Sequence, residues 1–248
     1  MAARTDHDER TDVEEPAPAP RRRGSGRLAM AVSVFGELLI TTGLVLGLFV
    51  VYSLWWTNVV ADRAADKQGD KVRDNWDAAD TGPGALDTKN GVGFLHVPAM
   101  KNGEVLVEKG TSSKVLNDGV AGYYTDPVKS ALPTSDKNGN FTLAAHRDGH
   151  GAKFHNIDKL KKGDAIVYET KDNWYVYKVY AILPETSKYN VKVLQSVPKQ
   201  SGKTKPGQYI TLTTCTPVYT SRYRYVVWGE LERVDKVDSD RTPPKELG

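Results

Sequence analysis

Cysteine is nearly absent from this chain: Cys215 is the only one in 248 residues. A single cysteine excludes an internal disulfide and any zinc site built from cysteine pairs. An isolated thiol is either a small buried apolar residue, the usual role of free cysteine, or a reactive nucleophile. The residues around it have to decide between these two interpretations.

The chain also has no concentrated basic surface and no metal-binding motif. Its net charge is only +3, and lysines and arginines are not gathered into the stripe that tracks phosphates. His146 and His150 are four residues apart, but Gly149 and Gly151 interrupt any helix that would place both on one face. There is no H-E-x-x-H pattern. We therefore predict no nucleic-acid partner and no metal.

Charge is wholly missing from one stretch, the 19 residues from Leu38 to Trp56. As a helix this stretch is about 28 Å long, close to the hydrocarbon thickness of a bilayer. Aromatic residues at positions 52, 55 and 56 crowd its far end, as is typical of a membrane interface. Four arginines precede it, at positions 21, 22, 23 and 27. The positive-inside rule then places the N-terminus in the cytoplasm and the rest of the chain outside.

The alternative for this stretch is a cleaved signal peptide, but the apolar run exceeds the usual h-region of roughly 7–15 residues. We therefore predict a retained, single-pass anchor at 28–56. Residues 1–27 are acidic, then rich in proline and alanine, then rich in arginine, which predicts a disordered cytoplasmic tail. Residues 57–90 are polar and end in a glycine- and proline-containing linker, which predicts an extracellular stalk. The folded domain is expected at 91–233, followed by a disordered C-terminal tail at 234–248.

The expected domain is dominated by short strands separated by glycine, proline, asparagine and aspartate turns. This pattern predicts an all-β barrel or sandwich with little helix. Short helical pieces are expected at 113–117 and 154–160. The predicted strands are Val92–Val97, Glu104–Glu108, Phe141–His146, Ala165–Tyr168, Trp174–Leu183, Gln208–Cys215 and Tyr223–Leu231.

Cys215 lies at the end of one predicted strand, and two arginines begin the next. If the chain reverses around Tyr219, Thr214 lies opposite Arg224 and Thr216 opposite Arg222, so either guanidinium can reach the thiol. Strand alternation alone does not choose between the arginines. A nearby imidazolium could protonate a leaving amine, and three histidines (146, 150 and 155) occur in one upstream segment. A fixed cation beside a thiol favours the thiolate.

These residues resemble the motifs of sortases, the membrane-anchored cysteine transpeptidases of Gram-positive bacteria. TLTTCTP at 211–217 resembles the family's TLxTC signature, and YRYVVWGEL resembles the arginine strand that follows it. GNFTLAAHRDGHGAKFHNIDKLKKGDAIVYET resembles the histidine segment, although Ala145 stands where many sortases carry glycine. The resemblance extends over 92–233 and is strongest to class E sortases of actinobacteria.

The resemblance implies His146 as catalytic histidine, Cys215 as nucleophile and Arg224 as catalytic arginine. Thr214 and Arg222 become candidate substrate-binding residues. The family fold is an eight-stranded β-barrel. The implied activity is cleavage of an LAxTG/LPxTG-type sorting signal between Thr and Gly. The Thr carboxyl is then joined to an amine of a lipid II-type peptidoglycan precursor. The bond exchange needs no ATP and no redox cofactor. Some sortases have a Ca²⁺ site, but this sequence shows no clustered carboxylates that require one. The expected partners are secreted proteins that bear a sorting signal.

Other functions remain as alternatives. One alternative is a sortase that assembles pili rather than anchoring proteins to the wall. A non-catalytic membrane-tethered β-barrel would bind wall or protein ligands and would not need Cys215 or His146. An L,D-transpeptidase usually has an S-H-G-C-x-R arrangement, whereas position 217 here is proline. Papain-like peptidases place the cysteine before the histidine, opposite to the order in this chain.

Overall fold

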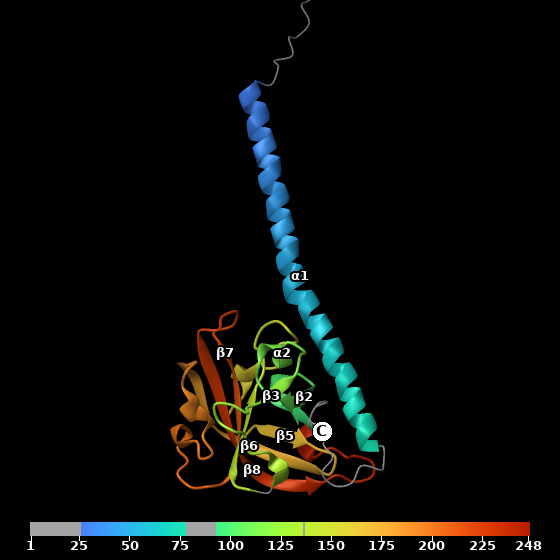
Figure 1. Cartoon of the computed structure of the whole chain (residues 1–248), viewed down its shortest axis with the longest axis vertical. Helices are drawn as coiled ribbons and strands as arrows, with labels where there is room; N and C mark the ends of the chain where they lie inside the picture. Colours follow the sequence, from blue (N-terminus) through green and yellow to red (C-terminus); the bar gives the residue numbers. More distant parts are fainter. Residues whose placement is uncertain (1–25, 78–92, 136) are drawn as a thin grey trace, which may run out of the picture. The chain divides into compact units, whose positions relative to one another are not determined.

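The computed structural model describes residues 26–77, 93–135 and 137–248, and its main element is a closed eight-stranded barrel (Figure 1). The helices are α1 (Arg27–Asp77) and α2 (Ser113–Leu116). The strands are β1 (Gly93–His96), β2 (Glu104–Lys109), β3 (Ala121–Tyr123), β4 (Gly139–Ala144), β5 (Ala165–Glu169), β6 (Asn173–Ser187), β7 (Gln208–Thr216) and β8 (Tyr223–Lys236). Within the described residues, six short 3₁₀ helices lie at 98–100, 133–135, 157–159, 191–194, 199–201 and 245–247.

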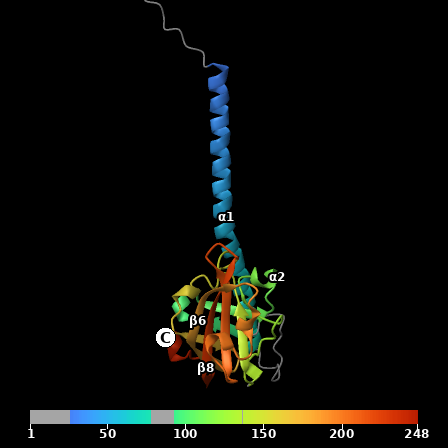
Figure 2. The ribbon, with the colours of Figure 1, turned by 90° about the vertical axis from the view of Figure 1, so that its left-hand side faces the viewer.

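The strands follow one another around the barrel in the order β1-β2-β3-β4-β7-β8-β6-β5. β2 pairs with β3 and β4 with β7 in parallel, whereas the other neighbours are antiparallel. The long pair of β6 and β8 lies side by side in Figure 2. The parallel β4–β7 pair matters most for function, because the histidine segment follows β4 and the cysteine lies on β7.

The alternation read from the sequence explains the barrel core. On β6, Tyr175, Tyr177 and Val179 belong to the main core, while Trp174 and Val176 pack in a separate cluster on the other face. Successive side chains of a strand point to opposite faces, so an alternating segment fills a core on one side only. The all-β prediction is confirmed. The additional strand β3 was not predicted, because it has three residues including a glycine and shows no periodicity.

The N-terminal part of the described chain is helical and apolar. The side chains of its apolar part are exposed, and the helix is long and apolar enough to cross a membrane. Residues 1–25 of the expected cytoplasmic tail and the linker near 81–90 lie outside the described residues, whereas Arg27, the last residue of that tail, begins α1.

The predicted stalk continues the same helix to Asp77. From Leu48 onward, α1 belongs to one compact unit with the barrel. Three of its buried side chains, Ala65, Val72 and Trp76, pack in a cluster whose barrel members are Phe94, Leu106 and Val120. This part of α1 is therefore a component of the folded domain.

The C-terminal segment differs from the disordered tail expected at 234–248. β8 extends to Lys236, and Leu247 packs against a cluster that contains Trp174. Arg241 donates to the buried Glu169 carboxylate at 2.7 Å, and Glu246 accepts from Arg233 at 2.6 Å. The composition of the segment is polar, but two of its partners, Glu169 and Trp174, lie on barrel strands far away in sequence. Composition alone therefore misjudged this segment.

Candidate functional site

Cys215 is the penultimate residue of β7 and is partly exposed. Ile210 and Leu212 of the same strand point into the barrel core. By alternation, Cys215 points to the outer face. Its direct cross-strand partner on β8 is Arg224. Opposite residues of an antiparallel pair present their side chains on the same face, with Cβ atoms about 5 Å apart.

This register differs by one residue from the one expected for a reversal around Tyr219. Thr214 pairs with Tyr225 and Thr216 with Tyr223, so Arg224 falls opposite the thiol-bearing residue. Arg222 precedes β8 and is exposed. The loop between the strands holds an even number of residues, and the centre of the reversal therefore lies between two residues. The alternation of side chains along each strand does not specify where the loop reverses, so it could not predict this shift of one residue in the register.

β4 brings His146 to the same end of the barrel. The last register pair of β4 and β7 is Ala144 with Thr213, and Ala145 N–H continues the pairing by donating to Thr213 O at 3.4 Å. His146 and Cys215 each lie two residues beyond that pair. In parallel strands, equal displacement from a register pair gives the same face.

His146 is oriented by a residue far away in sequence. Its Nε2 lies 2.9 Å from Asn117 Oδ1, at the end of α2. Because an amide oxygen only accepts, this contact requires the proton on Nε2. The His146 ring is 5.3 Å from the ring of His150. Burial lowers the pKa of His146, the nearby His150 lowers it further, and Asp148 opposes both.

Thr214 has a structural position rather than a substrate-facing one. It is 3% exposed, and its hydroxyl donates to Ala145 O at 2.7 Å. This bond fastens β7 to the segment that leads to His146. Of the other candidate histidines, His155 Nδ1–H donates to Arg147 O at 2.9 Å. His96 Nε2–H donates to Glu169 at 2.8 Å.

The sequence interpretation missed several residues next to the site, including Asn117. Arg147 is buried, and its guanidinium donates to Thr216 Oγ1 at 2.9 Å. Asp148 Oδ2 accepts from Tyr219 N–H at 2.6 Å. The Tyr124 hydroxyl lies 3.0 Å from Thr213 Oγ1. The pKa of Tyr124 is raised, mainly by burial and slightly by the nearby Cys215, although the Thr213 hydrogen bond and the charge of Arg224 act to lower it. Arg147 and Asp148 could have been found from the sequence, because these charged residues directly follow His146. No local sequence pattern indicates that Asn117 and Tyr124 lie near the site.

One group of residues in the described chain has the composition of a metal site. Ligand atoms of His96, Glu104 and Glu169 lie within 4.8 Å of one another. Arg73 pairs with both carboxylates, and Arg241 also pairs with Glu169. Two guanidinium groups already neutralise these carboxylates, so the chemistry of the cluster is that of an ion-pair network.

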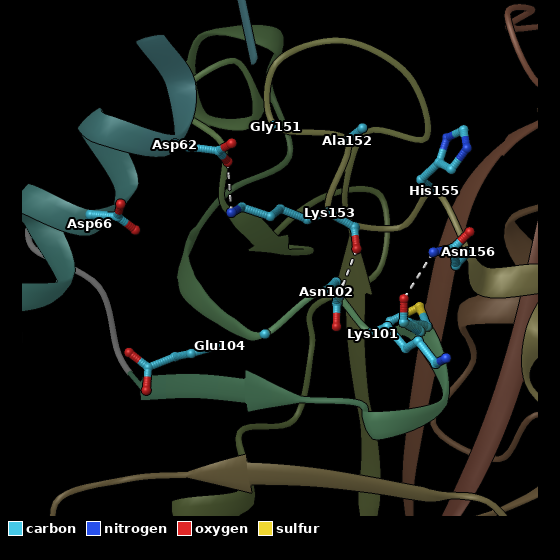
Figure 3. Close-up of a pocket in the computed structure, with 12 residues that line it drawn as sticks. Asp62, Asp66, Lys101, Asn102, Glu104, Gly151, Ala152, Lys153, His155 and Asn156 are labelled. Atoms are coloured by element: carbon cyan, nitrogen blue, oxygen red, sulfur yellow. Dashed lines mark hydrogen bonds and ion pairs between the residues drawn. The ribbon is translucent and has the colours of Figure 1, made fainter. Parts of the chain in front are cut away.

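A polar pocket of about 610 Å³ lies between α1 and two barrel loops (Figure 3). Asp62 and Asp66 line it from the helix, and the Asp62 carboxylate pairs with Lys153 at 2.9 Å. None of its twelve lining residues is Cys215, His146 or Arg224. The pocket is therefore separate from the cysteine site.

Comparison with known proteins gives a consistent result. The model of the sortase domain matches residues 95–232. The chain is 73% identical to sortase SrtE2 of Streptomyces coelicolor over the full length of both chains. It is 47% identical to sortase SrtE1 of the same organism, over 85% of this chain and 60% of that protein.

Solved structures give the same relationship. The crystal structure of Sortase E1 from Streptomyces coelicolor, with a tripeptide in the active site, aligns with a TM-score of 0.60 and 48% identity. This alignment covers 64% of this chain and 96% of that one. Sortase E of Streptomyces avermitilis aligns with a TM-score of 0.56 and 31% identity, over 64% of this chain and 97% of that one. The chain belongs to the sortase family of cysteine transpeptidases and resembles its class E members.

Proposed function

We propose that this sortase cleaves an LAxTG/LPxTG-type sorting signal between Thr and Gly and transfers the Thr carboxyl to an amine of a peptidoglycan precursor. Secreted proteins would thereby be anchored to the cell wall. The observation that carries this proposal is the cross-strand pair of Cys215 and Arg224, with His146 delivered to the same end by β4. The tripeptide in the active site of Sortase E1 supports a peptide substrate.

In the first half-reaction, the Cys215 thiolate attacks the Thr carbonyl carbon and forms the C–S bond. The Arg224 guanidinium stabilises the negative charge that develops on the carbonyl oxygen. The C–N bond to glycine then breaks as the His146 imidazolium gives its proton to the departing amine. The products are a thioester on Cys215, a neutral His146 and the released glycine-bearing peptide.

In the second half-reaction, the precursor amine attacks the thioester carbon. The C–S bond breaks, Cys215 leaves as thiolate, and neutral His146 takes the proton from the attacking nitrogen. The starting thiolate–imidazolium pair is thereby restored, and one amide bond has been exchanged for another. The Asn117 contact keeps a proton on Nε2 of His146, so Nδ1 is the nitrogen that exchanges it.

We further propose that residues 28–56 anchor the chain as a single span, with the N-terminus in the cytoplasm and the catalytic domain outside. The apolar helix and the four arginines that precede the span support this orientation. The substrate, which carries its own sorting signal out of the cell, then meets the enzyme on the outer surface.

The test uses the full-length chain in detergent micelles with LAxTG and LPxTG peptides and an amine acceptor, followed by mass spectrometry. We expect cleavage between Thr and Gly and a thioester adduct on Cys215. Arg224→Ala should lower kcat by about 100-fold, the cost of losing one oxyanion donor. Arg222→Ala is the matched comparison and should retain most of kcat.

The proposal fails if wild type and Cys215→Ala are equally inert across several sorting peptides. The non-catalytic barrel would then be favoured. Equal losses from the two arginine variants would contradict the assignment of Arg224. A strong preference for a lysine-containing pilin peptide over a peptidoglycan-type amine would favour the pilus-assembling alternative.

A further inference from the structure

Arg147 is a buried arginine that the reaction described above does not use. It follows His146 directly, and its side chain is 6% exposed. β4 ends before it and the chain bends at Arg147, whose side chain packs on the core side of the barrel and not on the outer face that carries His146. Its guanidinium lies 5.7 Å from the ring centroid of Tyr225, a member of the barrel core.

The guanidinium joins the histidine loop to the end of the cysteine strand. Nη1 donates to Thr216 Oγ1 at 2.9 Å and, more weakly, to the carbonyl oxygen of Cys215 at 3.5 Å. Nη2 donates to Asp158 Oδ1 at 3.1 Å, and Nε to His155 O at 3.4 Å. One planar group thus contacts two residues of β7 and two of the segment that follows the loop.

The backbone at Arg147 is held independently of its side chain. His155 Nδ1–H donates to Arg147 O at 2.9 Å, and Phe154 N–H donates to His146 O at 3.0 Å. These bonds close the loop at its base. The guanidinium is therefore presented from a backbone that is already fixed.

β7 needs support at this end. On one side, β8 pairs with it as far as Thr216. On the other side, the β4 register ends at Ala144 with Thr213, before the cysteine. Cys215 and Thr216 therefore have no β4 residue paired beside them. On that side, the Arg147 guanidinium donates hydrogen bonds to the carbonyl oxygen of Cys215 and the hydroxyl of Thr216.

We propose that Arg147 is a positioning residue of the transpeptidation reaction, which takes the place of β4 beside the last two residues of β7 and fixes Cys215 relative to His146. This inference rests on the proposed function. A planar fork with five donors can serve β7 and Asp158 together, whereas the ammonium of lysine is a single point of charge. At Cys215 the guanidinium contacts the carbonyl oxygen and not the thiol, so Arg147 acts through the backbone of Cys215.

The test compares Arg147→Met, Arg147→Lys and Thr216→Val in the full-length chain. Thr216→Val removes the hydroxyl acceptor while it keeps the shape, and it serves if Arg147→Met does not fold. Arg233→Met is the matched control, because Arg233 also forms ion pairs but lies at the far end of β8. Far- and near-UV circular dichroism confirm folding of each variant.

We expect Arg147→Met to lower kcat by about 10–100-fold, the scale of a displacement of roughly 1 Å at a reacting group, with little change in KM. Arg147→Lys should fall between wild type and Arg147→Met. The double variant with Thr216→Val should lose no more than Arg147→Met alone, since both changes break the same contact. Arg233→Met should retain kcat.

A folded Arg147→Met variant with unchanged kcat, or with only a raised KM, would overturn the inference. Additive losses in the double variant would also overturn it, because Arg147 would then act elsewhere. The rate of Cys215 alkylation by iodoacetamide needs no peptide substrate. A rate that changes in Arg147→Met and Thr216→Val but not in Arg233→Met supports the inference even if every sorting peptide fails. Identical alkylation rates in wild type, Arg147→Met, Thr216→Val and Arg233→Met would contradict the inference.

Discussion

At the scale of single residues, His146 is subject to opposing influences from its own loop. Burial and His150 lower its pKa, and Asp148 raises it. The proposed mechanism needs the imidazolium form of His146 together with the thiolate of Cys215. A lower pKa of His146 reduces the fraction of chains in that state, so the two neighbours should adjust activity in opposite directions.

We predict that His150→Asn moves the acidic limb of the kcat/KM profile to higher pH and raises activity at neutral pH. Asparagine suits this position because His150 has a φ of 48°. Asp148→Asn should move the same limb to lower pH, while its side-chain oxygen still accepts from Tyr219 N–H. The measurement is kcat/KM between pH 5 and 9. Limbs that coincide in all three proteins would show that these charges do not reach His146.

At the scale of elements, apolar contacts hold the C-terminal part of α1, from Ala65 to Trp76, against the barrel. Trp76 lies edge-on to Phe94, with ring centroids 5.3 Å apart, and is 9% exposed. We predict that Trp76→Ala lowers the free energy of unfolding by about 3 kcal/mol, the lower part of the range for a buried aromatic truncation. Tyr189→Ala is the control, because Tyr189 is 78% exposed. Urea unfolding in detergent should separate the two variants; equal midpoints would mean that α1 is not part of the cooperative unit.

Glu169 connects α1, β1 and the C-terminal segment. Burial acts to raise its pKa, but hydrogen bonds from His96, Arg73 and Arg241 outweigh this and lower it from 4.5 to about 2. A lowered carboxylate pKa stabilises the fold at pH above 4.5, and this stabilisation is lost as the pH falls toward 2. The shift corresponds to about 3 kcal/mol.

We therefore predict that Glu169→Gln is less stable than wild type at pH 7 by about this amount. Because the variant lacks the titrating group, the difference should shrink between pH 4.5 and 2. Urea midpoints at a series of pH values test this expectation. A constant difference across the whole range would show that the ion-pair network is not the cause.

The elements show what the sequence could and could not predict. Alternation and turn residues predicted seven of the eight strands, because those signals are local. β3 was missed because it is held by pairing with β2 and β4 rather than by its own residues. The same reasoning explains Asn117, which is 29 residues from His146 and meets it only through the fold. Whether Cys215 pairs with Arg224 or with its neighbour depends on the exact position of the reversal in the loop between β7 and β8, and no local sequence pattern specifies that position.

At the scale of the whole molecule, the distance between the expected membrane surface and the folded domain is short. Trp56 ends the charge-free stretch, and Ala61 is already 2% exposed within the domain. Five residues of helix span only about 7 Å. We therefore expect the catalytic domain to lie close to the bilayer, where a membrane-held substrate and a lipid-linked amine would both be within reach.

The orientation of the chain can be read through its lone cysteine. In intact Gram-positive protoplasts that express the chain, a membrane-impermeant maleimide should label Cys215, because the thiol is partly exposed and the domain is expected outside. A gel mobility shift of the tagged chain reports the labelling. Cys215→Ala should show no shift, and His146→Ala should still be labelled, which separates accessibility from activity. Labelling that requires permeabilised protoplasts would place the domain in the cytoplasm, and anchoring of secreted proteins would then be excluded.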